Sequence, residues 1–398
     1  MKRLVTKAIN PLKFFIADSR SIGILLLLCT GFSLIMSNTV SGEWYRGIWN
    51  FDILSKVGFL QSPLKWINDF LMSFFFLLAG MEIKRELVNG ELSSFKRAVL
   101  PFGAALGGMV VPALIFLLFN IHSGFSHGWG IPTATDIAFS LGIASLFGKR
   151  VPTTLKIFLM ALAIIDDLGA IIVIALFYGG HVQAMYLLLG AILYGLLWFC
   201  NYVRLRPGLI QVAISLLLWY AILNSGVEAS ITGVLVAFAM PVNSLPRLEK
   251  IIHGAVNFLI LPLFALANTA VLIPADISGA LNNSIGLGVI AGLVIGKPVG
   301  IFLFSRVLVA LKIAHLPGQV YWKQFLGMGT LAGIGFTMSI FTTTLAFTGE
   351  NHRDIAKISI LISMVLSLTI SWIYFVAIGK AQAGRSSRLQ PHGEIALG

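Results

Sequence analysis

The chain has 398 residues, of which 57% are hydrophobic and only 11% are charged. A soluble domain carries about 25% charged residues, so this composition excludes an ordinary soluble protein and is typical of a polytopic membrane protein. The net charge of +12 does not indicate a nucleic-acid partner, because the basic residues follow a membrane topology.

The apolar residues gather in twelve segments, and a helix needs about 20 such residues to cross a bilayer. We therefore predict an all-α polytopic membrane protein, with helices at about 14–38, 65–83, 97–120, 131–148, 153–179, 184–202, 208–223, 226–242, 255–273, 286–305, 325–347 and 356–379. No large soluble domain fits between them, so residues 1–398 are expected to form one transmembrane domain. The polar tail at 381–398 is expected to be disordered.

The positions of the basic residues orient these helices. With the N-terminus in the cytoplasm, most of the 28 Lys and Arg lie on that side. Only Arg46, Lys56, Lys65, Arg353 and Lys357 then lie outside. Cytoplasmic loops are enriched in Lys and Arg, so we expect both termini to be cytoplasmic and the apolar surface to contact membrane lipids.

The longest connection, residues 39–64, is unusually apolar for a free loop. It contains the stretch GEWYRGIWNFDILSKVGFL. Two interpretations remain open from the residues alone. The stretch either contacts a second copy of the chain or places its aromatic rings at the membrane interface.

Four ionisable side chains fall near the middle of predicted segments: Asp136 in the fourth, Asp166 and Asp167 in the fifth, and Lys297 in the tenth. An ionised side chain at the bilayer centre costs roughly 2.5–3.5 kcal/mol. The adjacent aspartates therefore indicate a water-filled path that carries protons or binds a cation.

Consecutive residues of a helix point about 100° apart, so Asp166 and Asp167 cannot face the same direction. One of them is expected to face a cavity, while the other pairs with Lys297. The alternative is a purely structural Asp–Lys pair, but buried pairs are poor stabilisers and this alternative leaves one aspartate unexplained. Asp136 is expected to compensate the partial charge of a helix end.

The chain resembles itself at an offset of 197 residues. LPFG at 100–103 aligns with KPVG at 297–300, and IAFSLGI at 137–143 aligns with IGFTMSI at 334–340. Seven segments separate the two copies, so we expect inverted-topology repeats at about 97–179 and 286–379. PTATD in the fourth segment and GTLAGIGFTMS in the eleventh favour broken helices there. The alternative is that these glycines serve close helix packing.

Six motifs, in order along the chain, resemble the NhaA family of bacterial Na⁺/H⁺ antiporters. They are FFFLLAGMEIKREL (74–87), PTATDIAFSLG (132–142), ALAIIDDLGAI (161–171), LPLFALAN (261–268), GKPVG (296–300) and GIGFTMSIF (333–341). This family is itself a known case of inverted repeats with broken helices, so the resemblance and the expected architecture are not independent.

The resemblance implies an electrogenic exchange of Na⁺ or Li⁺ for H⁺ in a bacterial inner membrane, without a cofactor. It implies that Asp167 is the main cation-binding carboxylate, that Asp166 is its partner and pairs with Lys297 in one state, and that Thr135, Asp136 and Lys297 support the site. It also implies a homodimer, formed through a hairpin within residues 39–64. The residues that it associates with pH response are Glu82, Arg85, Glu86, Glu249, Lys250 and His253. The chain departs from the pattern of the family at Glu228, where the best-studied relatives carry a histidine linked to pH response.

Three other classes of protein compete with this interpretation, two of them enzymes. An intramembrane aspartyl protease shares a proton between two carboxylates, but the usual GxGD setting is missing. A membrane prenyltransferase needs two Asp-rich motifs, and DDLGA supplies only one. A passive cation channel calls for a symmetric filter rather than one aspartate pair with a lysine. We therefore expect a transporter that is not an enzyme.

Overall fold

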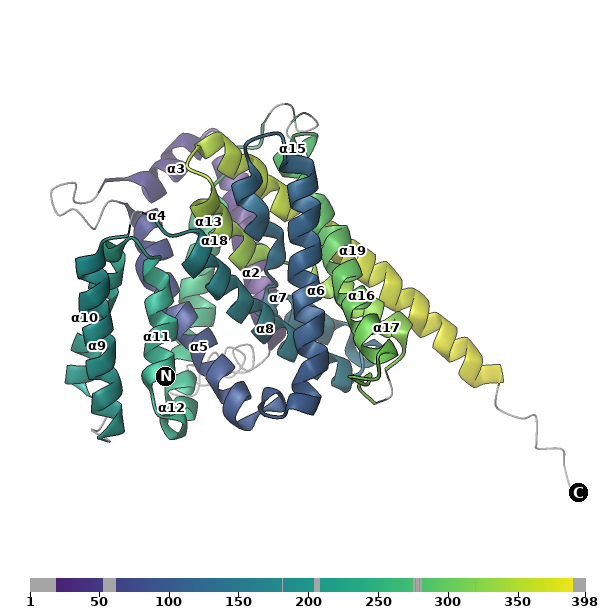
Figure 1. The fold of residues 1–398 in the computed structure, drawn as a ribbon. Coiled ribbons are helices and arrows are strands. Elements are labelled where there is room, and N and C mark those ends of the chain that lie inside the picture. The colour runs from purple at the N-terminus through teal and green to yellow at the C-terminus, as the bar shows by residue number, and fades with distance from the viewer. Residues whose placement is uncertain are drawn as a thin grey trace, which may run out of the picture.

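The computed structural model describes residues 19–388, apart from 53–61, 181, 204–207, 275, 277, 278, 280 and 319. All regular secondary structure in this described part is helical, and each of the twelve predicted segments contains a helix or a group of helices (Figure 1). The all-α architecture expected from the composition is therefore confirmed.

The first half of the bundle contains segments one to six. Its helices are α2 (Ser19–Ser37), α4 (Pro63–Trp66) with the π-helix η2 (Ile67–Leu71) and α5 (Met72–Asn89), α6 (Phe95–Asn120), the 3₁₀ helix η4 (Ser126–Thr133) with α7 (Ile137–Leu146), α8 (Thr153–Phe177), and α9 (Ala184–Tyr202).

The second half contains segments seven to twelve. Its helices are α10 (Leu209–Ser225), η6 (Ala229–Ile231) with α11 (Thr232–Ala239), α12 (Leu245–Ala255) with the π-helix η8 (Val256–Ile260) and α13 (Leu261–Asn268), α15 (Ser284–Ala291) with the π-helix η9 (Gly292–Gly296) and α16 (Lys297–Ala310), the pair α17 (Trp322–Ala332) and α18 (Phe336–Ala346), and α19 (Glu350–Arg388).

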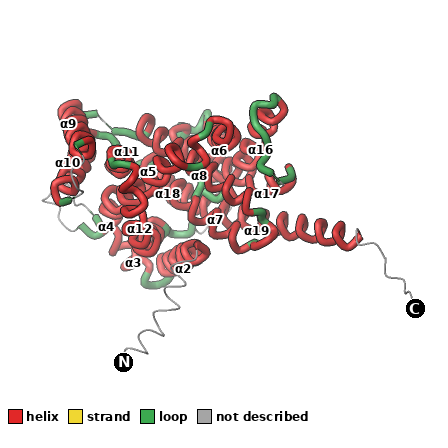
Figure 2. Tube along the Cα trace, turned by 90° about the horizontal axis from the view of Figure 1, so that it is seen from below, coloured by secondary structure: helices red, strands yellow, loops and turns green. Residues whose placement is uncertain are grey.

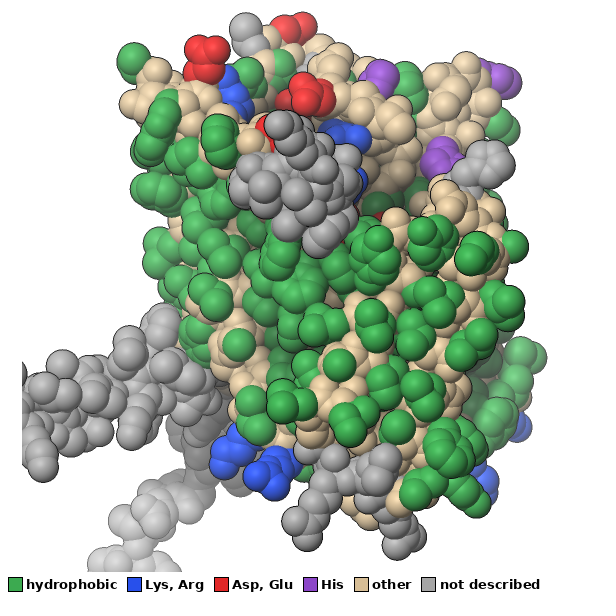
Figure 3. Space-filling view, turned by 90° about the vertical axis from the view of Figure 1, so that its left-hand side faces the viewer, with side chains coloured by type: hydrophobic (Ala, Val, Ile, Leu, Met, Phe, Trp, Pro, Cys, Tyr) green, Lys and Arg blue, Asp and Glu red, His purple; other side chains and the backbone are tan. Residues whose placement is uncertain are grey.

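Seven helices of the described part are long and apolar enough to cross a membrane, and nine if each bent pair is one span. The other predicted segments contain shorter helices, such as α10 with its 17 residues. Figure 3 shows that the face seen from the left of Figure 1 is mainly hydrophobic, with charged side chains gathered toward its upper and lower edges. This distribution is typical of a protein surrounded by lipid.

The structure differs from the expectation in one connection and in the C-terminal tail. Residues 39–64 are not simply a loop, because α3 (Gly42–Asn50) forms there and bends by 116° from α2. The possible hairpin falls partly on residues 53–61, outside the described residues. In the tail expected to be disordered from residue 381, helix α19 continues through Arg388.

Glycines allow α6 and α16 to approach closely. A Cβ atom added to Gly107 would overlap the carbonyl oxygen of Gly300, and one added to Gly300 would overlap that of Gly107. Small residues serve this purpose in membrane helices, where packing replaces the hydrophobic effect between helices. This contact sets Lys297, at the start of α16, beside the centre of the bundle.

The bundle has two distinct edges when it is seen along its axis. Helices α9 and α10 lie together at one edge, and the C-terminal part of α19 leaves at the opposite edge (Figure 2). The broken helices α7 and α17–α18 lie between these edges, together with α8. The centre of the bundle therefore contains the elements that carry the mid-membrane charges.

Candidate cation and proton site

Two interrupted helices meet at the centre of the bundle. Residues 134–136 are extended between η4 and α7, and residues 333–335 separate α17 from α18, which are bent by 47°. The Asp136 N–H donates to the Ile334 carbonyl at 2.8 Å, and the Thr135 hydroxyl lies within 3.1 Å of the Ala332 carbonyl. The two interrupted helices thus provide hydrogen-bond partners for each other's backbone groups. Unwound backbone in the middle of a membrane needs such partners.

A glycine is required where the two breaks come closest. A Cβ atom added to Gly335 would lie 2.6 Å from the Ala134 carbonyl oxygen, well inside van der Waals contact. The rings of Phe139 and Phe336, which correspond at the offset of 197, also touch here with centroids 5.5 Å apart. The predicted breaks in the fourth and eleventh segments are therefore present.

Asp136 caps two helices at once. Its Oδ1 accepts from the Phe139 N–H at 3.0 Å in the first turn of α7. Its Oδ2 accepts from the N–H and the hydroxyl of Thr337, at the start of α18, at 3.1 and 2.7 Å. The predicted compensation of a helix end is confirmed, because a carboxylate stabilises the positive N-terminal end of a helix.

Asp166 is paired with Lys297, as the sequence predicts. Lys297 Nζ lies 3.1 Å from Asp166 Oδ2, and both side chains are fully buried. The same oxygen accepts from the Thr135 hydroxyl at 2.6 Å, and Lys297 also donates to the Thr133 carbonyl. Asp166 Oδ2 and the ammonium are thus both hydrogen-bonded, as a buried pair needs if its desolvation is to be offset. Asp166 Oδ1 is buried without a hydrogen-bond partner among the described residues.

Asp167 has different surroundings, although it is the next residue of α8. Its side chain is buried, and its Oδ1 has no hydrogen-bond partner among the described residues. It faces a cavity that Asp166 does not line, which agrees with the predicted angle of about 100° between them. An unpartnered buried carboxylate oxygen is costly, so it marks a place where a ligand or a proton is needed.

The cavity has a volume of about 170 Å³, which leaves room for several water molecules. It joins the two broken helices to α5 and α12. Its polar lining residues are Glu82, Arg85, Thr135, Asp136, Asp167, His253, Asn257 and Thr337. It therefore connects the central carboxylates with the charged end of α5.

The residues predicted to respond to pH are only partly brought together. Arg85 forms ion pairs with Glu249 and, at 3.9 Å, with Glu86. Glu82, Arg85 and His253 line the cavity directly, and His253 contacts Asn257 at 3.0 Å.

Two other residues lie elsewhere. Lys250 is exposed and does not line the cavity. Glu228 lies before η6, outside the cavity lining, and its Oε1 is buried without a hydrogen-bond partner. The sequence grouped Lys250 with its neighbours, but the helical rotation of α12 separates them.

Two residues of the site were not predicted from the sequence. Thr337 donates to Asp136, and Asn257 contacts His253. A signal for Thr337 was available, because it stands in the GIGFTMS motif and corresponds to Ser140 at the offset of 197. Ser140 also donates across the crossing, to the Leu331 carbonyl at 2.9 Å. Hydroxyl side chains beside both breaks thus serve the same purpose.

Comparison with known proteins agrees with this arrangement. The family model described as Na⁺/H⁺ antiporter 1 matches residues 13–375. Similar proteins named Na⁺/H⁺ antiporter NhaA come from Dechloromonas aromatica (45% identity, 93% of this chain and 97% of that protein) and Escherichia coli O1:K1 (44%, 91% and 97%). Another, Na⁺/H⁺ antiporter NhaA 2 of Clostridium beijerinckii, is 42% identical over 94% of this chain and 96% of that protein. The chain therefore belongs to the Na⁺/H⁺ antiporter 1 family.

Proposed function

We propose that this chain exchanges Na⁺ for H⁺ across a membrane, with Asp166 and Asp167 as the shared binding site. The observation that carries this proposal is the unpartnered Asp167 carboxylate at a water-sized cavity, beside the Asp166–Lys297 pair. Hard cations such as Na⁺ prefer oxygen ligands, which carboxylates and hydroxyls supply here. Family membership supports the same activity.

Competition between Na⁺ and protons couples the two fluxes. A Na⁺ ion that enters the cavity binds the Asp167 carboxylate once the proton has left it. A change of access then exposes the site to the other side, where protons displace Na⁺. Coupling follows if the empty, charged site does not change its access, because a carboxylate without a counter-ion is too costly to move within the bilayer.

The exchange is proposed to be electrogenic, with two protons entering for each Na⁺ expelled. Asp166, Asp167 and Lys297 provide more than one titratable group, and such coupled groups release protons as a set. One net charge moving through 100 mV supplies about 2.3 kcal/mol. Since about 1.4 kcal/mol corresponds to a factor of ten, this is enough for more than a tenfold Na⁺ gradient. Li⁺, a small hard cation, is proposed as an alternative substrate.

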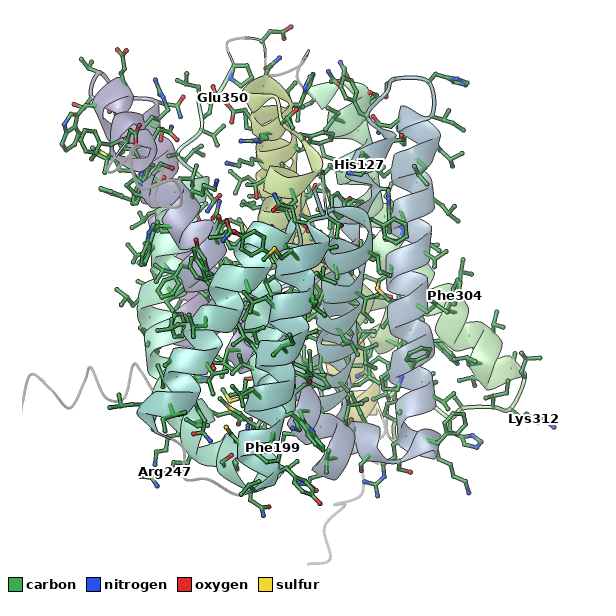
Figure 4. All side chains as sticks on the ribbon, turned by 60° about the vertical axis from the view of Figure 1, so that its left-hand side comes forward. His127, Phe199, Arg247, Phe304, Lys312 and Glu350 are labelled. Atoms are coloured by element: carbon green, nitrogen blue, oxygen red, sulfur yellow. The ribbon has the colours of Figure 1, made fainter. Side chains whose placement is uncertain are left out.

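We propose a bacterial inner membrane with both termini cytoplasmic. The end of the bundle that carries Arg247 and Lys312 is then cytoplasmic, and the end that carries His127 and Glu350 lies outside (Figure 4). The cavity consequently opens toward the cytoplasm, because it reaches Arg85 on α5 and His253 on α12.

Residues 97–179 and 286–379 are proposed as the inverted repeats whose broken helices cross at the site. The correspondence of Phe139 with Phe336 and of Thr135 with Ala332, which touch across the crossing, supports this relation.

The dimer is proposed to form through residues 39–64. Helix α3 leaves Trp44, Ile48 and Phe51 exposed at this end of the bundle, while Tyr45 is buried. Such exposed apolar residues favour either a partner or the membrane interface.

The pH response is proposed to arise where Arg85 holds Glu249 and Glu86 at the mouth of the cavity. His253 lines the cavity beside this cluster. A positive charge there, beside Arg85, would stand in the path of an entering cation. The cluster thus restrains Na⁺ access at low pH. Lys250, exposed on the far side of α12, and Glu228 are expected to contribute less directly.

A sodium-flux measurement with a proton read-out, in vesicles that contain the purified protein, tests this function. An antiporter moves protons against Na⁺, and net flux stops when the driving forces on the two ions balance. A channel would carry Na⁺ without proton movement, and a protease or prenyltransferase would carry neither ion. Either of these results would overturn the proposal.

A further inference from the structure

Asn257 is a polar side chain in an otherwise apolar stretch of the chain. It is the only polar residue in AVNFLILPLFALA at 255–267. The residue is 7% exposed and belongs to the π-helical turn η8, a kind of turn that is frequent at functional sites. Buried polar atoms are almost always hydrogen-bonded, so one that lacks a partner within the protein indicates a place for water or an ion.

The amide of Asn257 is only partly satisfied by the described residues. Its Nδ2 donates to Nε2 of His253, one helical turn earlier, at 3.0 Å. No described residue donates to its carbonyl oxygen, and the side chain lines the cation cavity. The hydrogen bond to His253 thus orients the planar amide and leaves Oδ1 for a ligand in the cavity.

Glu82 adds a carboxylate to the same cavity. Arg85, one turn away on α5, forms its ion pairs with Glu249 and Glu86, and no ion pair among the described residues includes Glu82. Helix α5 packs against η8, and Glu82 and Asn257 both line the cavity. The wall of the cavity therefore presents a carboxylate and a carbonyl oxygen, which are the ligands that hard cations prefer.

Both residues lie between the end of the bundle proposed to be cytoplasmic and the central aspartates. Glu82 is about 10 Å from that end of α5, counted at 1.5 Å per residue. Asn257 is about 15 Å along the helical run from Arg247, which lies near the same end (Figure 4). Asp167 is about 21 Å from the start of α8. A cation that enters at the mouth therefore passes Glu82 and Asn257 before it reaches Asp167.

We propose that Glu82 and Asn257 form an entry site for Na⁺, in which Asn257 Oδ1 is a ligand and His253 orients it. This inference rests on the proposed exchange of Na⁺ for H⁺. The ion at the entry site keeps part of its hydration, because the cavity has room for several water molecules. It thus loses its water ligands in steps, which avoids an unpaired charge in the apolar interior before it meets Asp167.

The Na⁺ dependence of exchange separates this role from a structural one. Exchange by the full-length protein in vesicles is measured at alkaline pH, with Na⁺ varied on the cytoplasmic side. Asn257→Leu removes the oxygen at a similar side-chain volume. It should raise the half-maximal Na⁺ concentration about tenfold, the effect of losing one interaction with a charged group. The maximal rate should be retained, because Asp166 and Asp167 are unchanged. An unaltered half-maximal concentration, or a lower maximal rate alone, would overturn the proposal.

Asn257→Asp distinguishes the carbonyl oxygen from the amide nitrogen. The aspartate keeps an oxygen ligand but cannot donate to His253 once it is ionised. Its half-maximal Na⁺ concentration should therefore equal that of the wild type or lie below it. If Asn257 served only to donate to His253, Asn257→Asp would match Asn257→Leu, and that result would contradict the proposal. Asn224→Leu makes the same substitution on α10, outside the cavity, and is the control that should leave the Na⁺ dependence unchanged.

The variant Glu82→Gln tests whether both residues hold the same ion. It should also raise the half-maximal Na⁺ concentration about tenfold, and the double variant with Asn257→Leu should raise it by less than the product of about a hundredfold. The full product would assign the two residues to separate ions and overturn the shared site.

Thermal unfolding in detergent shows which variants are folded, and Asn257→Ala carries the same prediction if Asn257→Leu does not fold. A wild type without Na⁺/H⁺ exchange would refute the proposed function itself. Variants that fail these expectations beside an exchanging wild type would refute the entry site alone.

Discussion

At the scale of single residues, the neighbouring aspartates Asp166 and Asp167 of α8 have different surroundings. Asp166 Oδ2 accepts from Thr135 and pairs with Lys297, while Oδ1 of each aspartate has no hydrogen-bond partner among the described residues. Of the two, only Asp167 lines the cavity. Asp167 is therefore the carboxylate that a cation or a proton can reach, which is the property required of a transport site.

Asp167→Asn is predicted to abolish exchange. The amide keeps one oxygen ligand but removes both the negative charge and the titrating proton, so neither substrate can bind productively. Asp166→Asn is predicted to be nearly as severe. Na⁺/H⁺ exchange is measured in vesicles across pH, and wild-type exchange at every pH in either variant would rule out this binding site.

Lys297→Ala is predicted to destabilise the protein by about 3–5 kcal/mol, because it leaves the buried Asp166 charge without its partner. Thermal unfolding in detergent measures the change, and transport should also be perturbed. The double variant Lys297→Ala with Asp166→Asn is the control, since it removes both charges and should recover much of the lost stability. An unaltered unfolding temperature in the single variant would contradict the role of the pair.

At the scale of elements, the crossing of the two broken helices organises the site. It orients Asp136 toward α7 and α18 together, and it places Thr135 next to Asp166. The hydrogen bonds across the crossing replace those that each helix loses at its break.

Gly335→Ala tests this crossing. Its Cβ atom would press on the Ala134 carbonyl and force the two breaks apart. We expect a loss of stability of about 1–3 kcal/mol, the usual cost of overpacking, together with weaker exchange. Gly195→Ala, on α9 and with nothing within 4 Å of the added atom, is the matched control. Similar unfolding temperatures for both variants would show that the crossing is not tightly packed.

Much of this site could be predicted from the sequence, because charges within apolar segments are costly and therefore conspicuous. Lys297 was the only mid-membrane cation, so its pairing with one of the two aspartates followed by elimination, whereas the choice of Asp166 was implied by the resemblance. The contact of Thr337 with Asp136 could not be predicted, because it joins residues 201 positions apart across a crossing whose angle depends on packing. The π-helical turn before Lys297 and the bend between α2 and α3 likewise depend on tertiary contacts.

Helix α3 gives a further prediction at this scale. Deletion of residues 44–58 removes the exposed Trp44, Ile48 and Phe51 and should yield monomers that still transport. Size-exclusion chromatography with light scattering measures the oligomeric state. The triple variant of these side chains to Ser is the control, because it keeps the buried Tyr45 in place. A dimer that persists in both variants would place the interface elsewhere.

At the scale of the whole molecule, two polar regions are separated by a band of apolar surface (Figure 3). The central site is connected through one cavity to the end of the bundle that carries Arg85 and His253. The pH therefore acts on transport in two separable ways. It sets the occupancy of the central carboxylates directly, and it changes the charge at the mouth of the cavity.

The direct effect has a defined sign. Activity should rise as the pH increases from neutral to alkaline, because deprotonation frees Asp166 and Asp167 for Na⁺. The charge at the mouth of the cavity should add a second effect, so His253→Ala should shift the profile, since it removes an ionisable side chain from the cavity lining. Lys250→Ala, on the same helix but outside the cavity, is the control. Identical profiles for the wild type and His253→Ala would remove His253 from the pH response.

The competition between Na⁺ and protons is the central claim, and the pH profile of exchange at several Na⁺ concentrations tests it most directly. By linkage, each tenfold increase in Na⁺ should move the profile of the wild-type protein to lower pH by about one unit if one proton competes with Na⁺, and by about half a unit if both of the proposed two protons compete. The shift should be smaller once Na⁺ saturates the site. A profile that does not move with Na⁺ would contradict a shared site for the two ions.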